Sequence, residues 1–210
     1  MATIVVVSAA CADDAPTHVS VVAIAATPCD RPTARLGVGT VVAEGLVLTA
    51  AHVVEDDLRR VEVDGRPGRV VALDTRIDVA VVSLDTPTDQ GAATMGAADV
   101  TDAVRIITPT GVIDTTVGRI VTLSVDDTTD GVVHRRRALV LAGTVPEGTS
   151  GAPVVDRDGL VVGLVNVVHA GRDVTYATPT AELQALLDAA HAPGNGSVTR
   201  PSLAAQEPCA

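Results

Sequence analysis

Short β-type segments follow one another at close spacing along this chain, and this pattern restricts the fold more than any other feature of the sequence. Six segments rich in Val and Thr precede the loop of residues 85–91, and six follow it. They are Val19–Ala25, Gly37–Ala43, Leu46–Thr49, Val61–Val63, Arg69–Leu73, Val79–Leu84, Val104–Thr108, Val117–Val125, Ala138–Leu141, Pro153–Val155, Leu160–Val168 and Val174–Ala177. Turn residues separate them and no helical period lies between them. The pattern predicts an all-β chain of two antiparallel six-stranded β-barrels rather than a βαβ sheet.

One helix is expected, over residues 180–191, after the last strand. Thr180 is a candidate N-cap, and Leu183, Leu186 and Leu187 share one face. The predicted organisation is an N-terminal segment and linker at 1–17, a first barrel at 18–97, a second barrel with the closing helix at 98–191, and a flexible tail at 192–210.

Composition narrows the classes of function. Apolar residues make up 47% of the chain, but Phe and Trp are absent, so the core must consist of Val, Ala, Leu and Ile. The net charge of −11 argues against nucleic acid or an anionic membrane as a partner. No Cys or His stands at metal-ligand spacing, so neither a metal nor another cofactor is expected.

The segment Gly148-Thr149-Ser150-Gly151-Ala152-Pro153 is the first candidate for chemistry. Ser150 stands between glycines and before a proline, which is typical of a tight turn that exposes a hydroxyl and several backbone N–H groups. A serine hydroxyl is a weak nucleophile that needs a base and a partner to orient that base.

A base and an acid are found upstream. His52 follows the apolar run 46–51, and Asp78 stands directly before the strand Val79–Leu84. Asp74 and Asp85 are rival acids nearby, but Asp78 is preferred because burial at a strand start can fix it. The order His, Asp, Ser is that of the chymotrypsin arrangement.

The three segments 49–52, 78–81 and 148–153 resemble the signature segments of trypsin-like serine peptidases, and most closely those of the bacterial HtrA kind. The resemblance spans about residues 18 to 187 and implies a chymotrypsin-like fold without a PDZ domain. It implies an endopeptidase acting on polypeptides, with His52, Asp78 and Ser150 as the triad and the N–H groups of Gly148 and Ser150 as the oxyanion hole. A catalytically silent binding protein on the same fold and a structural surface lipoprotein remain alternatives.

The resemblance also concerns specificity and activation. It places Thr144 at the base of the pocket for the residue before the scissile bond, with Asn166 and Val168 on the opposite wall. This predicts cleavage after small or medium apolar residues. Thr149 replaces the aspartate that pairs with the new amino terminus in trypsin-like zymogens, and no Ile-Val-Gly-Gly segment is present, so activation by a terminal salt bridge is not expected.

The cysteines and the amino-terminal segment bear on location. Cys29 and Cys209 could form a disulfide in an oxidising compartment, although three free thiols are the alternative. Residues 1–10 are apolar and end in small residues, as at the end of a secretory signal, and residues 8–11 resemble a bacterial lipobox that would lipidate Cys11. The expected location is therefore extracytoplasmic, with membrane anchoring through Cys11 as an option.

Overall fold

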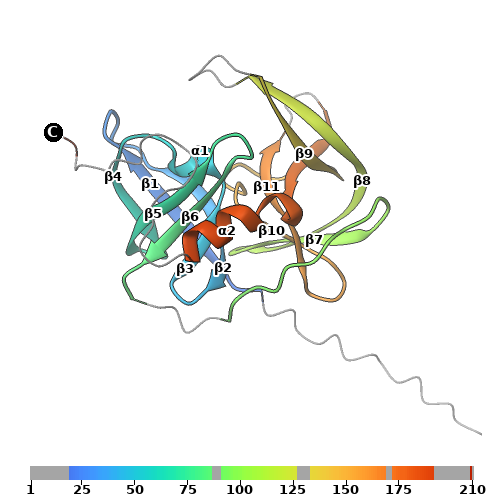
Figure 1. Cartoon of the computed structure of the whole chain (residues 1–210), viewed down its shortest axis with the longest axis horizontal. Coiled ribbons are helices and arrows are strands. Elements are labelled where there is room, and N and C mark those ends of the chain that lie inside the picture. Colours follow the sequence, from blue (N-terminus) through green and yellow to red (C-terminus); the bar gives the residue numbers. More distant parts are fainter. Residues whose placement is uncertain (1–18, 87–90, 127–132, 169–171, 192–208, 210) are drawn as a thin grey trace, which may run out of the picture.

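The computed structural model describes residues 19–86, 91–126, 133–168, 172–191 and Cys209, and these form two β-barrels side by side (Figure 1). The first barrel contains β1 (Val21–Pro28), β2 (Arg35–Ala43), β3 (Leu46–Thr49), β4 (Leu58–Val63), β5 (Arg66–Asp74) and β6 (Val79–Leu84), with the short helix α1 (Ala51–Val54) after β3. The second contains β7 (Ala103–Thr108), β8 (Gly111–Asp126), β9 (Val133–Ala142), β10 (Pro153–Val155), β11 (Val161–Val168) and β12 (Val174–Pro179).

Both barrels are closed and share one strand order. The first runs β1-β2-β3-β6-β5-β4, and the second runs β7-β8-β9-β12-β11-β10 when it is read from β7. Every pairing between these strands is antiparallel. The prediction of two antiparallel six-stranded barrels is therefore confirmed, and closure leaves neither sheet with a free edge.

The cores consist of aliphatic side chains, as the composition requires. Val41, Val47 and Val82 are buried inside the first barrel, and Ile106 and Leu139 inside the second. β-Branched side chains suit the pleated surface of a small barrel because they fill it without a large ring.

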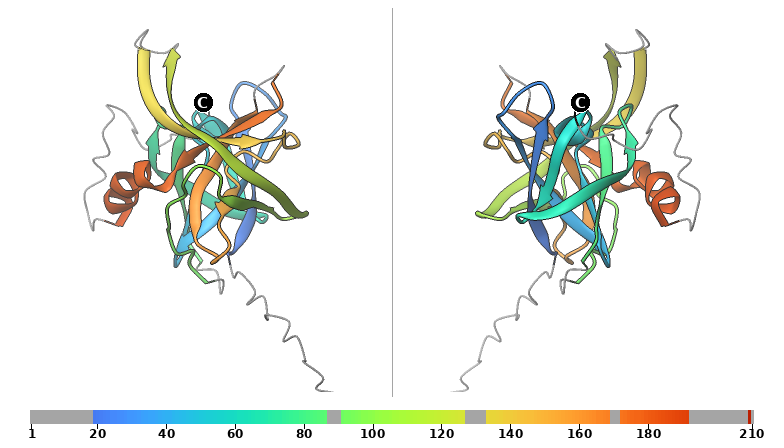
Figure 2. Two further views of the ribbon diagram at one scale, coloured as in Figure 1. Left: turned by 90° about the vertical axis from the view of Figure 1, so that its right-hand side faces the viewer. Right: turned by 90° about the vertical axis from the view of Figure 1, so that its left-hand side faces the viewer.

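The paired strands β8 and β9 are the longest in the second barrel and curve away from the rest of it (Figure 2). On β9, only the C-terminal part, from Leu139 to Ala142, pairs with β12. The N-terminal part of β9 pairs with β8 and not with β12, and one of its side chains, Arg136, reaches Asp78 of the first barrel.

The closing helix differs from the prediction in its start and in its neighbours. A 3-10 turn (η1, Thr180–Glu182) precedes α2 (Gln184–His191). The expected N-cap by Thr180 is wrong, because its hydroxyl donates to the carbonyl of Gly96. Although α2 follows the second barrel in sequence, it packs on β5 and β6 of the first, where its leucines join Leu48 and Val81 in one buried cluster.

A disulfide joins Cys29, directly after β1, to Cys209, with the two Cα atoms 5.6 Å apart. The predicted signal residues 1–10 and the candidate lipidation site Cys11 lie outside the described residues. Among the described helices, none is long and apolar enough to cross a membrane.

Candidate active site

The strand register of the first barrel brings His52 and Asp78 together. Thr49, the last residue of β3, pairs with Ala80 near the start of β6. Because the pair is antiparallel, the chain leaving β3 passes beside the chain entering β6. His52 and Asp78 lie on these two segments, which explains why two residues distant in sequence meet.

His52 is the one half-exposed residue of α1. Ala51, Val53 and Val54 are buried and fix the helix on the barrel, so that the imidazole is directed outward. The guanidinium of Arg35 donates to the carbonyl of His52 over 2.8 Å and is ion-paired with Asp56. The base therefore stands on a short helix that is held by both packing and polar contacts.

Asp78 is 7% exposed, and its carboxylate contacts both the backbone and the ring of His52. Oδ1 accepts the backbone N–H of His52 over 2.9 Å, and ring Nδ1 lies 3.0 Å from both carboxylate oxygens. The backbone of Asp78 has φ +58°, a left-handed conformation that aspartate tolerates better than most residues. Of the rivals, Asp74 is ion-paired with Arg76 and Asp85 is exposed, so the geometry favours Asp78.

Asn166 of β11 supports Asp78 from the second barrel. Its amide nitrogen donates to the backbone carbonyl of Asp78 over 2.9 Å and to Oδ2 over 3.1 Å. The N–H of Thr178 donates to the amide oxygen of Asn166 over 2.7 Å, which fixes the orientation of that amide. The side chain of Asn166, expected on the pocket wall, is buried and directed to Asp78.

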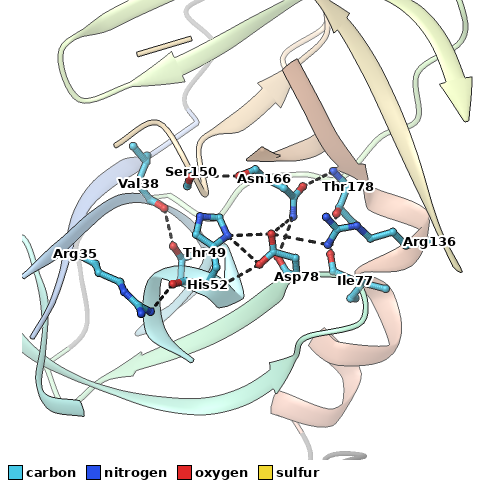
Figure 3. A network of polar contacts seen from close by, with 10 residues as sticks. All are labelled: Arg35, Val38, Thr49, His52, Ile77, Asp78, Arg136, Ser150, Asn166 and Thr178. Carbon is cyan, nitrogen blue, oxygen red and sulfur yellow. Dashed lines mark hydrogen bonds and ion pairs between the residues drawn. The ribbon is translucent and has the colours of Figure 1, made fainter. Parts of the chain in front are cut away.

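Sequence reasoning missed Arg136 of β9. It is 8% exposed, and its Nη1 lies 3.8 Å from Oδ2 of Asp78. Figure 3 shows the guanidinium on the side of Asp78 away from His52. One signal was present in the sequence: Arg136 stands two residues before the buried Ala138, so strand alternation puts both side chains on the same face.

Ser150 lies on the connection from β9 to β10, beside the imidazole ring of His52 (Figure 3). Its carbonyl accepts the N–H of Val38 from the first barrel over 2.8 Å. Among the described residues, the partner of its hydroxyl is the carbonyl of Asn166, at 3.3 Å. The structure thus brings all three predicted triad residues to one place between the barrels, with Asp78 and Ser150 on different sides of His52.

A tight turn precedes Ser150, as the segment 148–153 predicted. Thr149 donates its N–H to the carbonyl of Pro146 over 3.3 Å, and Gly148, the third residue of this turn, has φ +83°. A positive φ at that position is typical of a type II turn. The N–H groups of Gly148 and Ser150 donate to no other group within the described residues, so both are available to a ligand oxygen.

The hydroxyl of Thr149 reinforces the same turn. Thr149 is 4% exposed, and its Oγ1 donates to the carbonyl of Pro146 over 2.7 Å, so this carbonyl accepts from both the side chain and the backbone of Thr149. A buried threonine therefore holds this turn through contacts within the turn itself.

Two opposing effects act on the base. Burial, the largest single effect, lowers the pKa of His52, while the hydrogen bond and charge of Asp78 and the charge of Glu55 raise it. Arg35 opposes them weakly, and the net result is a pKa of His52 above its ordinary value of 6.5. The carboxylates around the ring therefore raise the pKa of His52 by more than desolvation lowers it.

The remaining predicted pocket residues are only partly described. Thr144 is exposed on the β9–β10 connection, so it does not form a buried floor. The backbone of Val168 pairs with Thr175 at the end of β11, whereas its side chain lies outside the described part of the structure. Within the described ranges, no group of three or more His, Cys, Asp or Glu side chains could hold a metal ion.

Residues 37–164, more than half of the chain, match the family described as the trypsin-like peptidase domain. No curated protein matches the sequence significantly.

Several solved structures share the fold. The active form of the Rv3671c protease from M. tuberculosis superposes with a TM-score of 0.74 at 22% identity, covering 88% of this chain and 87% of that one. An inactive form of Rv3671c gives a TM-score of 0.64 at 21% identity and covers 81% of this chain and 89% of that chain. The HtrA-type protease AlgW with a tripeptide gives 0.66 at 20% identity, and the match covers 80% of this chain and 59% of AlgW.

Proposed function

The chain belongs to the trypsin-like peptidase family, a family of serine endopeptidases, and on this premise we propose that it cleaves polypeptides through an acyl-enzyme formed on Ser150. The observation that carries the proposal is the position of His52, bonded through Nδ1 to a buried carboxylate and facing Ser150 with its other edge (Figure 3). That is the arrangement in which an imidazole can take a proton from serine.

The reaction follows from these positions. The Oγ of Ser150 attacks the scissile carbonyl carbon while Nε2 of His52 takes its proton, and Asp78 holds the imidazolium that results. The same proton passes to the leaving amine as the C–N bond breaks, which leaves an ester on Ser150. Water then repeats the sequence in place of the serine hydroxyl and releases the acid. Asn166 contributes by fixing Asp78 in the orientation that His52 requires.

The developing oxyanion is received by the N–H groups of Gly148 and Ser150. A type II turn at Pro146–Thr149 directs its central N–H away from the turn's own hydrogen bond, which leaves that donor for a ligand. Donors fixed in advance stabilise the tetrahedral intermediate without reorganisation, and the loss of one such donor costs about 10²–10³ in kcat. The hydroxyl of Thr149 supplies the fixation within the turn itself.

Substrates are polypeptides, cut after small or medium apolar residues. Thr144, which the resemblance places beside the substrate side chain, is exposed and uncharged, so it supplies no anion that would favour an arginine or lysine. Thr144 carries this expectation without the side chain of Asn166, which donates to Asp78. Broad selectivity is expected, since one methylene changes the rate by about 10- to 200-fold.

An extracytoplasmic location fits the disulfide between Cys29 and Cys209, because such bonds persist in oxidising compartments. Export through residues 1–10 and lipid attachment at Cys11 remain part of this proposal. Mass spectrometry of unreduced protein exported from cells should show the Cys29–Cys209 peptide pair. Alkylation of both thiols without prior reduction would contradict it.

A fluorophosphonate probe tests the proposal directly. The wild-type protein should be labelled on one serine, and Ser150→Ala should abolish the labelling. Ser124→Ala is the matched control, because Ser124 is exposed on β8 and should not affect the reaction. A folded wild-type protein that resists the probe would favour the silent binding protein.

Specificity needs a separate experiment. A peptide library digested by the wild-type protein and read by mass spectrometry should show cuts after Ala, Val or Leu and few after Arg or Lys. Dominant cuts after Arg would show that an acidic side chain reaches the pocket.

A further inference from the structure

A buried arginine contacts the acid of the proposed triad from the other barrel. Three arginines stand in succession on β9, and strand alternation exposes Arg135 and Arg137 while it buries Arg136 at 8% exposure. A guanidinium cannot lose its proton in a protein, so burial requires a paired anion. The ion pair that the structure gives Arg136 is with Oδ2 of Asp78, at 3.8 Å.

Asp78 therefore contacts both the His52 ring and a permanent cation, Arg136. His52 approaches one side of the carboxylate, and Arg136 approaches the side away from the ring, next to Asn166 and Thr178 (Figure 3). The ring is the group that exchanges a proton, whereas the arginine keeps its charge at every working pH. Any charge that Arg136 balances on Asp78 is no longer fully available to stabilise a protonated His52.

We propose that Arg136 is a positioning residue that lowers the proton affinity of the His52–Asp78 pair and so keeps the base neutral at lower pH. The inference rests on the proposed function and deepens it, because it names a residue that sets the pH at which His52 can act as the base. It requires no assignment of the proton to one member of the pair, since a nearby fixed cation disfavours proton uptake by either.

The other charges near the base act in both directions. Asp78 and Glu55, from the first barrel, favour the protonated ring, and Arg35 of β2 opposes it weakly. Arg136 is the charged group that approaches Asp78 from the second barrel, in the described part of the chain. It therefore couples the state of the base to the position of β9, the strand whose N-terminal part pairs with β8 alone.

The decisive variant is Arg136→Gln, with Arg137→Gln as the matched control on the exposed face of the same strand. In Arg136→Gln the acidic limb of kcat/KM against pH should move to higher pH by about half to one unit, because the carboxylate now acts on the ring alone. The plateau of kcat at high pH should stay within about tenfold, since the reacting atoms are unchanged. Arg137→Gln should leave the midpoint where it is.

A second readout does not need turnover. The His52 ring, followed by NMR titration in Ser150→Ala protein, should show the same upward shift when Arg136→Gln is added. A midpoint that does not move in folded Arg136→Gln overturns the inference, as would a shift of equal size in Arg137→Gln. If wild-type protein proves inactive, the NMR titration still decides the role of Arg136 separately from the proposed function.

Stability keeps the inference testable if Arg136→Gln alone does not fold. Asp78→Asn leaves the guanidinium buried without its anion, and adding Arg136→Gln removes the uncompensated charge. The double variant should therefore melt at a higher temperature than Asp78→Asn alone. A double variant that melts at the same temperature as Asp78→Asn, or lower, shows that the two charges are not coupled and overturns the inference.

Discussion

The two barrels share one strand order, but the connection from the third to the fourth strand is built differently in each. In each, the connection from the third to the fourth strand carries a candidate catalytic side chain: His52 lies between β3 and β4, and Ser150 between β9 and β10. The first connection is stiffened by a helical turn packed on the barrel. The second is an open turn stiffened by Gly148, Thr149 and Pro146.

The difference shows how one topology supplies two kinds of rigidity. A base needs a fixed ring orientation, which buried neighbours and a carboxylate provide. A nucleophile with an oxyanion hole needs exposed backbone donors, which a helix or strand would consume. Each barrel also fixes a site residue of the other. Val38 of the first barrel donates to the carbonyl of Ser150, and Asn166 of the second barrel donates to Asp78.

The largest expected loss of kcat comes from removing a proposed catalytic side chain from either barrel. His52→Ala in the first barrel and Ser150→Ala in the second should each lower kcat by about 10⁶-fold, because neither residue works without the other. The double variant should be no slower than either single variant. Steady-state kinetics on a peptide substrate measure all three, and additive losses would show that the two connections do not form one unit.

Removing the carboxylate of Asp78 should lower kcat by less than removing His52 or Ser150. Asp78→Asn should keep the fold and lower kcat by about 10⁴-fold, since an amide no longer selects the reactive tautomer of His52. Asp74→Asn is the matched control, because Asp74 is ion-paired with Arg76 at the end of β5. A large loss in Asp74→Asn with little loss in Asp78→Asn would identify a different acid.

Gly151 tests how closely the barrels approach. Its φ is +88°, and a Cβ there would lie 2.0 Å from the carbonyl oxygen of Val38 and 2.6 Å from Oγ1 of Thr49. Gly65 has φ +73° with nothing within 4 Å of such a Cβ. Gly65→Ala should therefore cost about 1–2 kcal/mol of unfolding free energy from the dihedral alone, and Gly151→Ala at least about 3 kcal/mol. Urea unfolding measures both, and equal losses would mean that the interface relaxes easily.

Much of this architecture could be predicted because it depends on local patterns. The twelve strands follow alternation and turn residues. The residues of the proposed triad stand in segments of marked local character: an apolar run before His52, a strand start at Asp78 and a glycine-flanked turn at Ser150. The shared strand order could not be predicted, because the sequence shows no repeat and closure depends on pairings distant in the chain.

The supporting residues were missed for the same reason. Asn166 and Arg136 act across the barrel boundary, where the inward direction of a side chain on one barrel must be matched with a residue on the other. Thr180 shows the converse, since its local signal for an N-cap was overridden by the carbonyl of Gly96. Contacts between elements, unlike those within them, leave little trace in local spacing.

Thr149 should have a moderate effect confined to the second barrel. Thr149→Val removes the hydroxyl donor to Pro146 at nearly constant volume and should lower kcat by about 5- to 10-fold, the worth of one hydrogen bond of about 1 kcal/mol. Thr149→Ser should restore most of the rate because it keeps the donor. The pH midpoint should be unchanged in both, since the base lies on the other barrel. A shifted midpoint would mean that Thr149 acts on His52 instead of the turn.

The smallest effect concerns the charge balance of the first barrel. Because the pKa of His52 lies above 6.5, kcat/KM should rise from acidic to neutral pH with a midpoint above 6.5 and then level off. Stability depends on pH in the opposite direction to activity. The stabilisation of the fold by the His52–Asp78 ion pair is fully present below pH 6.5 and is lost as pH rises through the folded-state pKa of His52.

Glu55→Gln sharpens this last point. Glu55 raises the pKa of His52 through its charge alone, so the variant should lower the activity midpoint slightly and leave the plateau unchanged. Glu44→Gln, on the exposed turn between β2 and β3, serves as the matched control and should move nothing. A rate already maximal near pH 4 in the wild type would mean that a group other than His52 is the base. A midpoint that rises in Glu55→Gln would mean that the carboxylate of Glu55 does not act on the ring as a negative charge.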